Sequence, residues 1–272
     1  MTKIKKSIAL DTNFEKTFDH IGMTALNTTE TDTTESLITE LTRPEGWGVS
    51  VADIIGQNSV RLDAEHYNPK ISKNMEMLEA SKYGLLPLAD LAQIDLPGQF
   101  VRIWAKDAEH GIPYLNATDL MSFAALGEPA QLRYLSKATD VNIDRLIVRE
   151  GMILVTCSGT LGRVFEVPKA LDGWVGTHDI IRVIPTDPAM KGYIRAFLSS
   201  SYAQTQILSH THGGQIDHVT ANQIRSCLVP QLSDKQMRAI SIQMDKSEKM
   251  KQKAAGMVLT SLSQIKEALD NV

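Results

Sequence analysis

The sequence predicts a mixed α/β (α+β) domain followed by a long C-terminal coiled-coil helix. Short apolar runs rich in β-branched residues and bounded by Gly, Pro or Asp fill the middle of the chain, for example DRLIVREGMILVTCSG at 144–159 and HDIIRVIPTD at 178–187. Apolar residues recur at helical spacing on both sides of these runs, and no proline follows residue 230. The sheet is therefore expected in the centre, with helices before and after it.

The composition is that of a soluble globular protein. The 272 residues are 43% hydrophobic and 22% charged, and no run approaches the roughly eighteen apolar residues that could span a bilayer. Cys157 and Cys227 form neither a disulfide framework nor a metal-ligand spacing, and the N-terminus lacks the apolar stretch of a signal peptide. These features predict a cytoplasmic protein without membrane association.

The net charge of −4 provides no global attraction for nucleic acid. Binding to DNA would need a local basic surface on an otherwise acidic molecule. Net charge alone therefore argues mildly against a DNA-binding role.

Changes in composition divide the chain into three regions. Residues 1–45 include a stretch rich in Thr, Glu and Asp and poor in aromatic residues, which predicts a peripheral or weakly ordered arm. Turn signals at Arg43, Pro44 and Gly46 precede the first apolar clusters, so the folded domain is expected at 46–232. The long helix follows at 233–272.

Within the domain, the apolar period of each segment favours one type of element. Residues 70–84 have apolar side chains at mostly helical spacing and end in a glycine, which predicts a glycine-capped helix. FVRIWA at 100–105 alternates as a strand does, and GIPYLNATDL (111–120) and GRVFEVP (162–168) are further strand candidates. A second helical segment is expected at 190–211.

The C-terminal helix carries an apolar seam. It starts at Ser233 and Asp234, and its apolar residues step by three or four positions with a polar break at Ser247 and Lys251. A helix of about 35 residues is roughly 50 Å long, which favours pairing with a helix of another copy or subunit; packing against its own domain is the alternative. The seam residues are Met237, Ile240, Met244, Ala254, Val258, Leu262, Ile265 and Leu269.

A histidine-rich loop raises the question of a metal site. His210, His212 and His218 have Asp217 as the only nearby carboxylate and no cysteine, so a zinc site is the weaker interpretation. Gly213 and Gly214 instead permit a sharp turn, either as simple packing or for close approach to a phosphate. Thr220 is expected to begin a short helix whose amide groups could accept an anion.

The segment SGTLGR at 158–163 lacks the lysine and spacing of a nucleotide-binding loop, and it lacks the G-x-S-x-G pattern of a hydrolase elbow. A tight turn between two strands is the main interpretation. A phosphate contact through Arg163 or the hydroxyl groups is the alternative.

Four segments, in order along the chain, resemble the target recognition domain of the specificity (S) subunits of type I restriction-modification systems. The resemblance covers about residues 46–270, and the chain resembles half of an S subunit, with one recognition domain and one long helix. The chain departs from the usual motifs of this family at two places. His66 stands where the family more usually has tyrosine, and the segment PQLSDKQ before the helix stands in place of Pro-Pro-Leu-x-Glu-Gln. The segments are VRLDAEHYNPK (60–70), GIPYLNATDL (111–120), ILVTCSGTLGRV (153–164) and GGQIDHVTANQIRSCLVPQLSDKQ (213–236).

The resemblance implies a non-catalytic subunit without cofactor or metal. It would read a bipartite target on double-stranded DNA and direct a modification subunit, an adenine methyltransferase, together with a restriction subunit, in defence against phage. A homodimer through the C-terminal helix would supply two half-sites. A recognition-like scaffold that binds a methyltransferase or defence partner without reading DNA is the alternative, and a stand-alone enzyme ranks last.

Base reading in the major groove needs exposed Arg, Lys, Asn or Gln side chains, and phosphate contact needs cations or backbone amides. The candidates lie in the turns of the domain and in the histidine-rich loop. They are Gln99, Arg102, Lys106, Arg133, Lys137, Arg163, His178, Gly213, Gly214, Gln215, His218 and Thr220.

Overall fold

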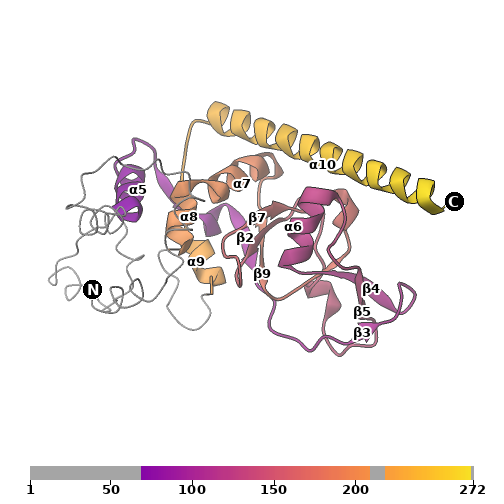
Figure 1. Cartoon of the computed structure of the whole chain (residues 1–272). Coiled ribbons are helices and arrows are strands. Elements are labelled where there is room, and N and C mark those ends of the chain that lie inside the picture. Colours follow the sequence, from indigo (N-terminus) through magenta and orange to yellow (C-terminus); the bar gives the residue numbers. More distant parts are fainter. Residues whose placement is uncertain (1–68, 209–217, 271–272) are drawn as a thin grey trace, which may run out of the picture. The chain divides into compact units, whose positions relative to one another are not determined.

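The computed structural model describes residues 69–208 and 218–270 (Figure 1). The arm at 1–45, most of the first S-subunit-like segment, and His210, His212, Gly213, Gly214 and Gln215 lie outside the described residues. No described helix is both long and apolar enough to cross a bilayer.

A four-stranded antiparallel sheet forms the centre of the domain. Its order is β2 (Ala92–Asp95), β9 (Ile180–Pro185), β6 (Ile153–Thr156) and β7 (Val164–Glu166). Both faces are covered, because Ile153 and Val155 pack in the main core cluster while Leu154 packs in a second cluster. The continuous apolar run in the sequence reflects this burial on both sides, and the expected strands at 153–156, 164–166 and 180–185 are confirmed.

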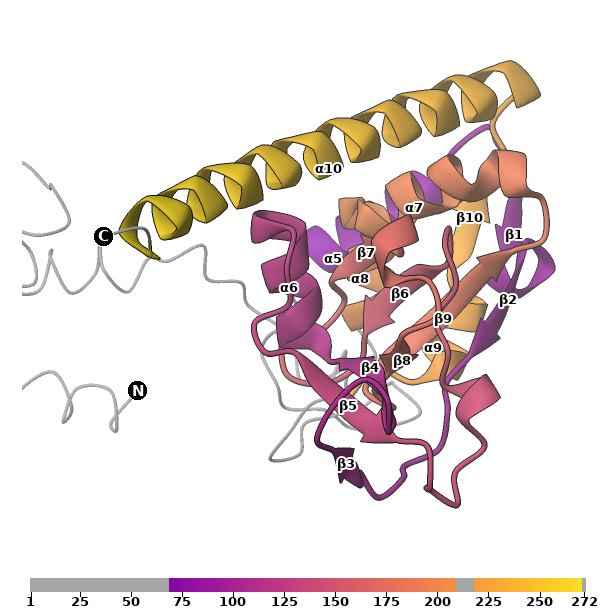
Figure 2. The same cartoon turned by 90° about the vertical axis from the view of Figure 1, so that its right-hand side faces the viewer.

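A second sheet lies at the end of the domain farthest from the C-terminal helix (Figure 2). Its order is β3 (Trp104–Ala105), β5 (Arg133–Ser136), β4 (Gly111–Leu115) and β8 (Val175–Gly176), with β4 and β8 parallel and the other pairs antiparallel. A short pair, β1 (Leu85–Pro87) with β10 (Leu228–Pro230), joins the beginning and the end of the domain.

The buried side chain of Arg182 ties the two sheets together. It lies on β9, is 2% exposed, and donates to the carbonyl oxygens of Thr177, Ile180, Leu146 and Gly176 at 2.8–3.4 Å. Burial lowers the pKa of Arg182 to about 10. The guanidinium thereby provides donors to four buried carbonyl oxygens, one of which, that of Leu146, also accepts from the amide of Gly176.

Five α-helices lie between residues 69 and 226: α5 (Pro69–Glu79), α6 (Ala117–Leu126), α7 (Lys191–Ser199), α8 (Ser201–Leu208) and α9 (Ala221–Ser226). Of these, α5 packs mainly against α8. The core cluster contains side chains of α7, α8 and α9, whereas α6 contributes Leu120 to the cluster on the other face.

Three sequence predictions need correction. The helix expected at 70–84 ends at Glu79, well before Gly84, and the segment at 190–211 divides at Ser200, whose backbone is extended and whose Oγ donates to Phe197 O. The strand expected at 100–105 includes only Trp104 and Ala105.

The helix α6 was missed because GIPYLNATDL reads as a strand over its first half. Asn116 accepts a hydrogen bond from the amide of Asp119, and the Asp119 side chain accepts from the amide of Asn116, which forms a capping box. The chain therefore turns from strand to helix at Asn116.

The long C-terminal helix is confirmed as α10 (Asp234–Asp270), 37 residues. It lies across α7 and α6 (Figures 1 and 2). Met237, Ser241 and Ala255 are its buried residues, and Gly192 on α7 permits close approach to the backbone of Ser241. Every residue from 260 to 270 is exposed.

Candidate nucleic-acid interface

A cluster of arginine and aromatic side chains lies on the second sheet. Arg102, from the extended segment before β3, donates from Nε to the hydroxyl of Tyr114 at 2.8 Å and from Nη2 to Thr177 Oγ1 at 3.2 Å. Its guanidinium carbon lies 6.0 Å from the ring centre of Phe100 and 5.9 Å from that of Tyr114. These contacts and an ion pair with Asp179 at 3.5 Å hold the guanidinium in one orientation.

Arg133 on β5 approaches the same tyrosine. Its guanidinium carbon lies 5.2 Å from the ring centre of Trp104 and 5.5 Å from that of Tyr114. Nη2 forms an ion pair at 3.1 Å with Asp119, the 2% exposed residue that caps α6. The capping box thus also fixes an arginine on the neighbouring sheet.

His178 completes the cluster. Its Nδ1 lies 3.4 Å from Arg102 Nη2, and its ring meets Phe100 edge-on with the centroids 5.7 Å apart. Two of the sequence candidates, Arg102 and Arg133, therefore converge on Tyr114, and a third, His178, contacts Arg102. We call Phe100, Arg102, Trp104, Tyr114, Arg133 and His178 the arginine–aromatic cluster.

Three other candidates lie on turns of the same segments. Gln99, Lys106 and Lys137 are exposed. Lys137 Nζ donates to the carbonyl of Glu109 at 2.9 Å, and Lys106 forms only a long exposed pair with Asp107 at 3.9 Å. Such side chains are held weakly and can turn toward a ligand.

The SGTLGR segment forms the turn between β6 and β7, as its main interpretation predicts. The Thr156 hydroxyl donates to the carbonyl of Thr160 and accepts from the amide of Arg163 at 3.0 Å, while Gly159 and Gly162 have φ of 69° and 70°. Beside the turn is a cavity of about 320 Å³ with hydroxyl and charged side chains in its wall. Among its lining residues are Thr118, Ser158, Thr160, Arg163, Thr177 and Asp179.

Thr177 and Asp179 contact both Arg102 and this cavity, so the arginine–aromatic cluster and the turn are neighbours. Thr220 and His218 belong to a different part of the chain. Thr220 caps the six-residue α9 through a box with Gln223, as the sequence predicts for a helix start, and His218 is exposed.

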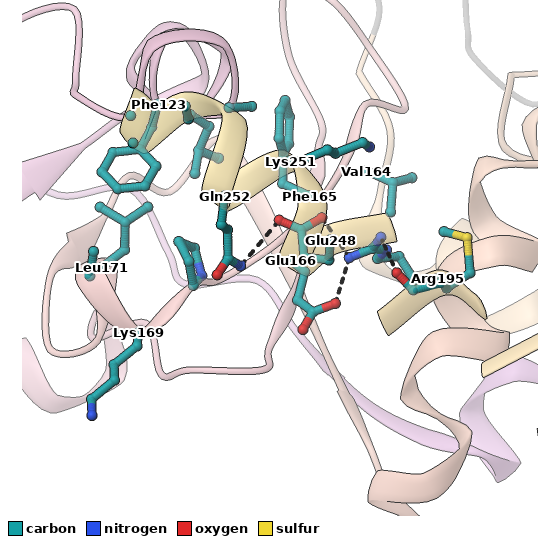
Figure 3. A pocket seen from close by; sticks show the side chains of 18 of the residues that line it. Phe123, Val164, Phe165, Glu166, Lys169, Leu171, Arg195, Glu248, Lys251 and Gln252 are labelled. Atoms are coloured by element: carbon teal, nitrogen blue, oxygen red, sulfur yellow. Dashed lines mark hydrogen bonds and ion pairs between the residues drawn. The ribbon is translucent and has the colours of Figure 1, made fainter. Parts of the chain in front are cut away.

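A larger cavity of about 640 Å³ lies between α10, α6, β7 and α7 (Figure 3). Phe123, Phe165 and Leu171 line its apolar part. In its polar part Arg195, 4% exposed, pairs with Glu166 and, at 2.9 Å, with Glu248 of α10. These ion pairs attach the middle of α10 to the body of the domain.

The structure corrects part of the predicted partner seam on α10. Met237 belongs to the main core cluster and Ile240 packs against it, while Met244 lines the cavity beneath the helix. These three side chains face the chain's own domain, because this part of α10 packs on α7. Val258, Leu262, Ile265 and Leu269 stay exposed, between 37% and 70%.

Sequence reasoning missed the aromatic residues and acids of the cluster. Tyr114 reads as an ordinary buried strand residue, and Asp119 and Asp179 have no local motif that assigns them to an arginine. The capping pattern Asn-x-x-Asp at 116–119 is the one available signal, and it would have identified α6 and its buried carboxylate.

No protein-family model matches the sequence, and no curated protein is significantly similar to it. Solved structures provide the matches. The S subunit of the type I restriction-modification system from M. genitalium is 14% identical with a TM-score of 0.39, and the match covers 60% of this chain and 38% of that one. The HsdS subunit from Thermoanaerobacter tengcongensis is 11% identical with a TM-score of 0.45, over 76% of this chain and 50% of that one.

The chain is similar to S subunits. It spans half or less of these S-subunit chains. A further match is the type IIG restriction endonuclease BpuSI, 12% identical with a TM-score of 0.45, over 75% of this chain and 34% of that enzyme.

Proposed function

We propose that this chain is the DNA recognition subunit of a type I-like restriction-modification system. It directs a partner adenine methyltransferase, and with it a restriction subunit, to a bipartite target on double-stranded DNA, and it performs no catalysis itself. The observation that carries the proposal is the arginine–aromatic cluster, which offers preorganised arginines at the end of the domain remote from α10 (Figure 2).

The cluster has the chemistry of base recognition. Arginine reads guanine through two parallel hydrogen bonds to O6 and N7, which requires a guanidinium with a fixed orientation. Among the described residues, the hydrogen bonds of Arg102 use Nε and Nη2, so Nη1 is available to a ligand, and the two-bond contact to guanine would require Nη2 to leave Thr177 and Asp179. The contacts with Phe100 and Tyr114 reduce the conformational entropy that the Arg102 side chain would lose on binding.

Phosphate contacts would come from the surrounding cations and from the turn. Arg163, Lys106 and Lys137 are exposed near the cluster or at the neighbouring cavity, and Gln99 and His178 provide further polar groups. Cations concentrated here would give an acidic chain the local basic surface that duplex binding requires. His218, Thr220, Gly213, Gly214 and Gln215 remain candidates for a second contact.

The exposed part of α10 supports partner binding. Six of its large apolar side chains between residues 250 and 270 are exposed, and a second copy of the chain would cover them in a homodimer with two recognition domains. The methyltransferase subunit would then bind the dimer.

The proposal is tested by duplex binding and by methylation. Purified chain should bind a target duplex with an affinity that falls steeply as salt rises. Arg102→Lys keeps the charge but loses the planar fork, so it should retain salt-sensitive binding while losing discrimination of at least about 10-fold between target and scrambled duplexes. Arg238→Ala, an exposed arginine on α10, is the matched control and should bind as the parent does.

The target itself comes from mapping methylated adenines in cells that contain this chain and its cognate methyltransferase. Methylation at paired half-sites with a fixed spacing supports the proposal. Methylation that is independent of the chain contradicts it.

A second candidate function is a scaffold that binds a methyltransferase or another defence partner without reading DNA. The ion pairs Arg102 with Asp179 and Arg133 with Asp119 favour it, because they neutralise part of the positive charge that a phosphate backbone would attract. Co-purification with the methyltransferase that depends on α10, without retardation of any duplex, would support the scaffold.

A further inference from the structure

The cavity of about 640 Å³ between α10, α6, β7 and α7 has the size and the walls of a binding site for a small molecule (Figure 3). Such sites occupy about 300–1,000 Å³ and have mostly apolar walls with a few polar groups. Leu120 and Leu171 in the wall are 3% and 2% exposed, whereas Phe123 and Phe165 are only half-buried. An apolar occupant would therefore remove further aromatic surface from water. We call this space the α10 cavity.

Small side chains leave the α10 cavity open where α10 covers it. Ala255 and Gly256 of α10 and Ala124 of α6 line it. A Cβ on Gly256 would meet no atom within 4 Å, whereas a Cβ on Gly192 would lie 2.4 Å from the carbonyl oxygen of Ser241. Packing thus requires a glycine at 192 but not at 256, and glycine lowers the stability of a helix interior. What the glycine at 256 provides is open space beside the cavity.

The acidic side chains of the α10 cavity already have partners. Glu166 and Glu248 both form ion pairs with Arg195, whose side chain is 4% exposed. Glu166 also pairs with Lys191, and Gln252 donates to Glu248 at 3.4 Å. A cationic ligand would have to compete with these partners, so the polar end of the cavity does not favour one.

Two cations of the α10 cavity are free. Lys169 on η4 (Lys169–Leu171) and Lys251 on α10 both line it, and they lie on different walls (Figure 3). Both are exposed, and neither forms an ion pair with any residue that the structure describes. They lie at the solvent side of the cavity, where a negative charge would be attracted and would keep part of its hydration.

We propose that the α10 cavity binds a freely dissolved amphipathic anion, such as a medium-chain carboxylate or an aromatic sulfonate. Its apolar body lies against Phe123 and Phe165, and its charged group lies at the solvent side between Lys169 and Lys251. The cavity and the arginine–aromatic cluster have no residue in common, so this site is independent of DNA recognition. Because its walls belong to α6, β7 and α10, a bound anion holds α10 more firmly on the domain.

Titration of the full chain with anilinonaphthalene sulfonate, an aromatic anion that fluoresces in apolar surroundings, measures the binding. Decanoate should displace it from one site per chain. Octanoate should bind about 15-fold more weakly than decanoate, because each buried methylene contributes about fourfold. Decylammonium has the same chain and the opposite charge, so it should bind about 10-fold more weakly or worse. Equal binding of decanoate and decylammonium would overturn the anionic class.

Gly256→Phe tests whether the anion lies in the α10 cavity. The ring would occupy open space at the solvent side, so it should weaken decanoate at least about 30-fold without lowering the midpoint of urea denaturation. Gly256→Ala is the matched control and should bind decanoate as the parent does, because one methyl group leaves the cavity open.

The contribution of charge is tested on α10. Lys251→Gln should weaken decanoate about threefold and leave the binding of decanol unchanged. Lys253→Gln removes the same charge from an exposed position that does not line the cavity, so it should have no effect on either ligand. A loss of decanoate binding that is equal in both variants would contradict the assigned contact.

Hydrogen exchange locates the bound anion. With decanoate, the amides of residues 244–259 should exchange more slowly, and those of α5 should not change. Absence of saturable decanoate binding below its micelle concentration, or unchanged binding in Gly256→Phe, would overturn the inference. Flotation of the chain with phosphatidylglycerol vesicles that Gly256→Phe abolishes would place the anion in a membrane and would likewise contradict a dissolved ligand.

Discussion

The contact of α10 with its own domain depends on the absence of a side chain at Gly192. A Cβ at this position would lie 2.4 Å from the carbonyl oxygen of Ser241 and 2.7 Å from its Cα. Both atoms belong to the α10 backbone, so no side-chain rotation can relieve the clash. Normal contact distances of about 3.5–4.0 Å require the two helices to separate locally by about 1 Å.

Gly192→Ala should therefore destabilise the protein. Overpacking of this kind costs about 1–3 kcal/mol, and the gain in helix propensity offsets at most about 1 kcal/mol. The shift also loosens two hydrogen bonds of Ser241 Oγ, which accepts from the amide of Tyr193 at 3.3 Å and donates to the carbonyl of Ala189 at 2.7 Å. We expect a net loss of about 1–2 kcal/mol in the free energy of unfolding.

Urea denaturation measures this loss, and hydrogen exchange of residues 237–248 shows whether α10 is released. Gly256→Ala is the matched control, because no atom lies within 4 Å of its Cβ position and the same substitution there should stabilise α10 by up to about 1 kcal/mol. If Gly192→Ala were as stable as Gly256→Ala, with unchanged exchange in α10, the close contact between α7 and α10 would not exist as described.

Three further outcomes follow from buried groups. Arg182→Met should lose about 3 kcal/mol in urea denaturation, because it removes the four hydrogen bonds that the guanidinium donates to buried carbonyl oxygens; an unchanged midpoint would contradict the cation's role. Burial raises the pKa of Tyr193 from its usual 10.0 to about 12, so the stabilisation by its neutral form is present below pH 10 and lost between pH 10 and 12. Tyr193→Phe should accordingly show a shallower fall in unfolding free energy over that range, and an identical slope would contradict this origin. Burial raises the pKa of Cys157 to about 11 and that of Cys227 to about 12, so both thiols should resist a thiol reagent at pH 8 until the chain unfolds; rapid labelling of the native chain would refute their burial.

Local patterns in the sequence predict much of the fold. The apolar runs at 153–156 and 180–185 are strands of the central sheet, and the proline-free segment after residue 233 is a single helix. The alternation of apolar residues in a strand and the capping residues of a helix involve positions at most about four residues apart. Such patterns can therefore be recognised in the sequence without knowledge of the fold. The prediction of a strand at 100–105 was wrong over most of its length, because alternation of side chains alone does not supply a neighbouring strand for Phe100 to Arg102.

The sequence predicted individual residues of the candidate interface but not their arrangement. Exposed cations such as Arg102 and Arg133 could be named as candidates because of their chemistry. Their convergence on Tyr114 could not be read from the sequence, because it depends on a pairing of β4 with β5 and on a loop that brings Thr177 and Asp179 to Arg102 from 75 or more residues away.

The sequence by itself determined that α10 is a long helix with an apolar seam, since these properties depend on neighbours within one or two turns. Only the tertiary structure decided how that seam is divided. Gly192 lets α7 approach Ser241, and the ion pair of Arg195 with Glu248 joins side chains 53 residues apart. The first part of the seam thereby packs against the chain's own domain, whereas Val258, Leu262, Ile265 and Leu269 remain exposed, because burial depends on which surfaces the fold brings together in space.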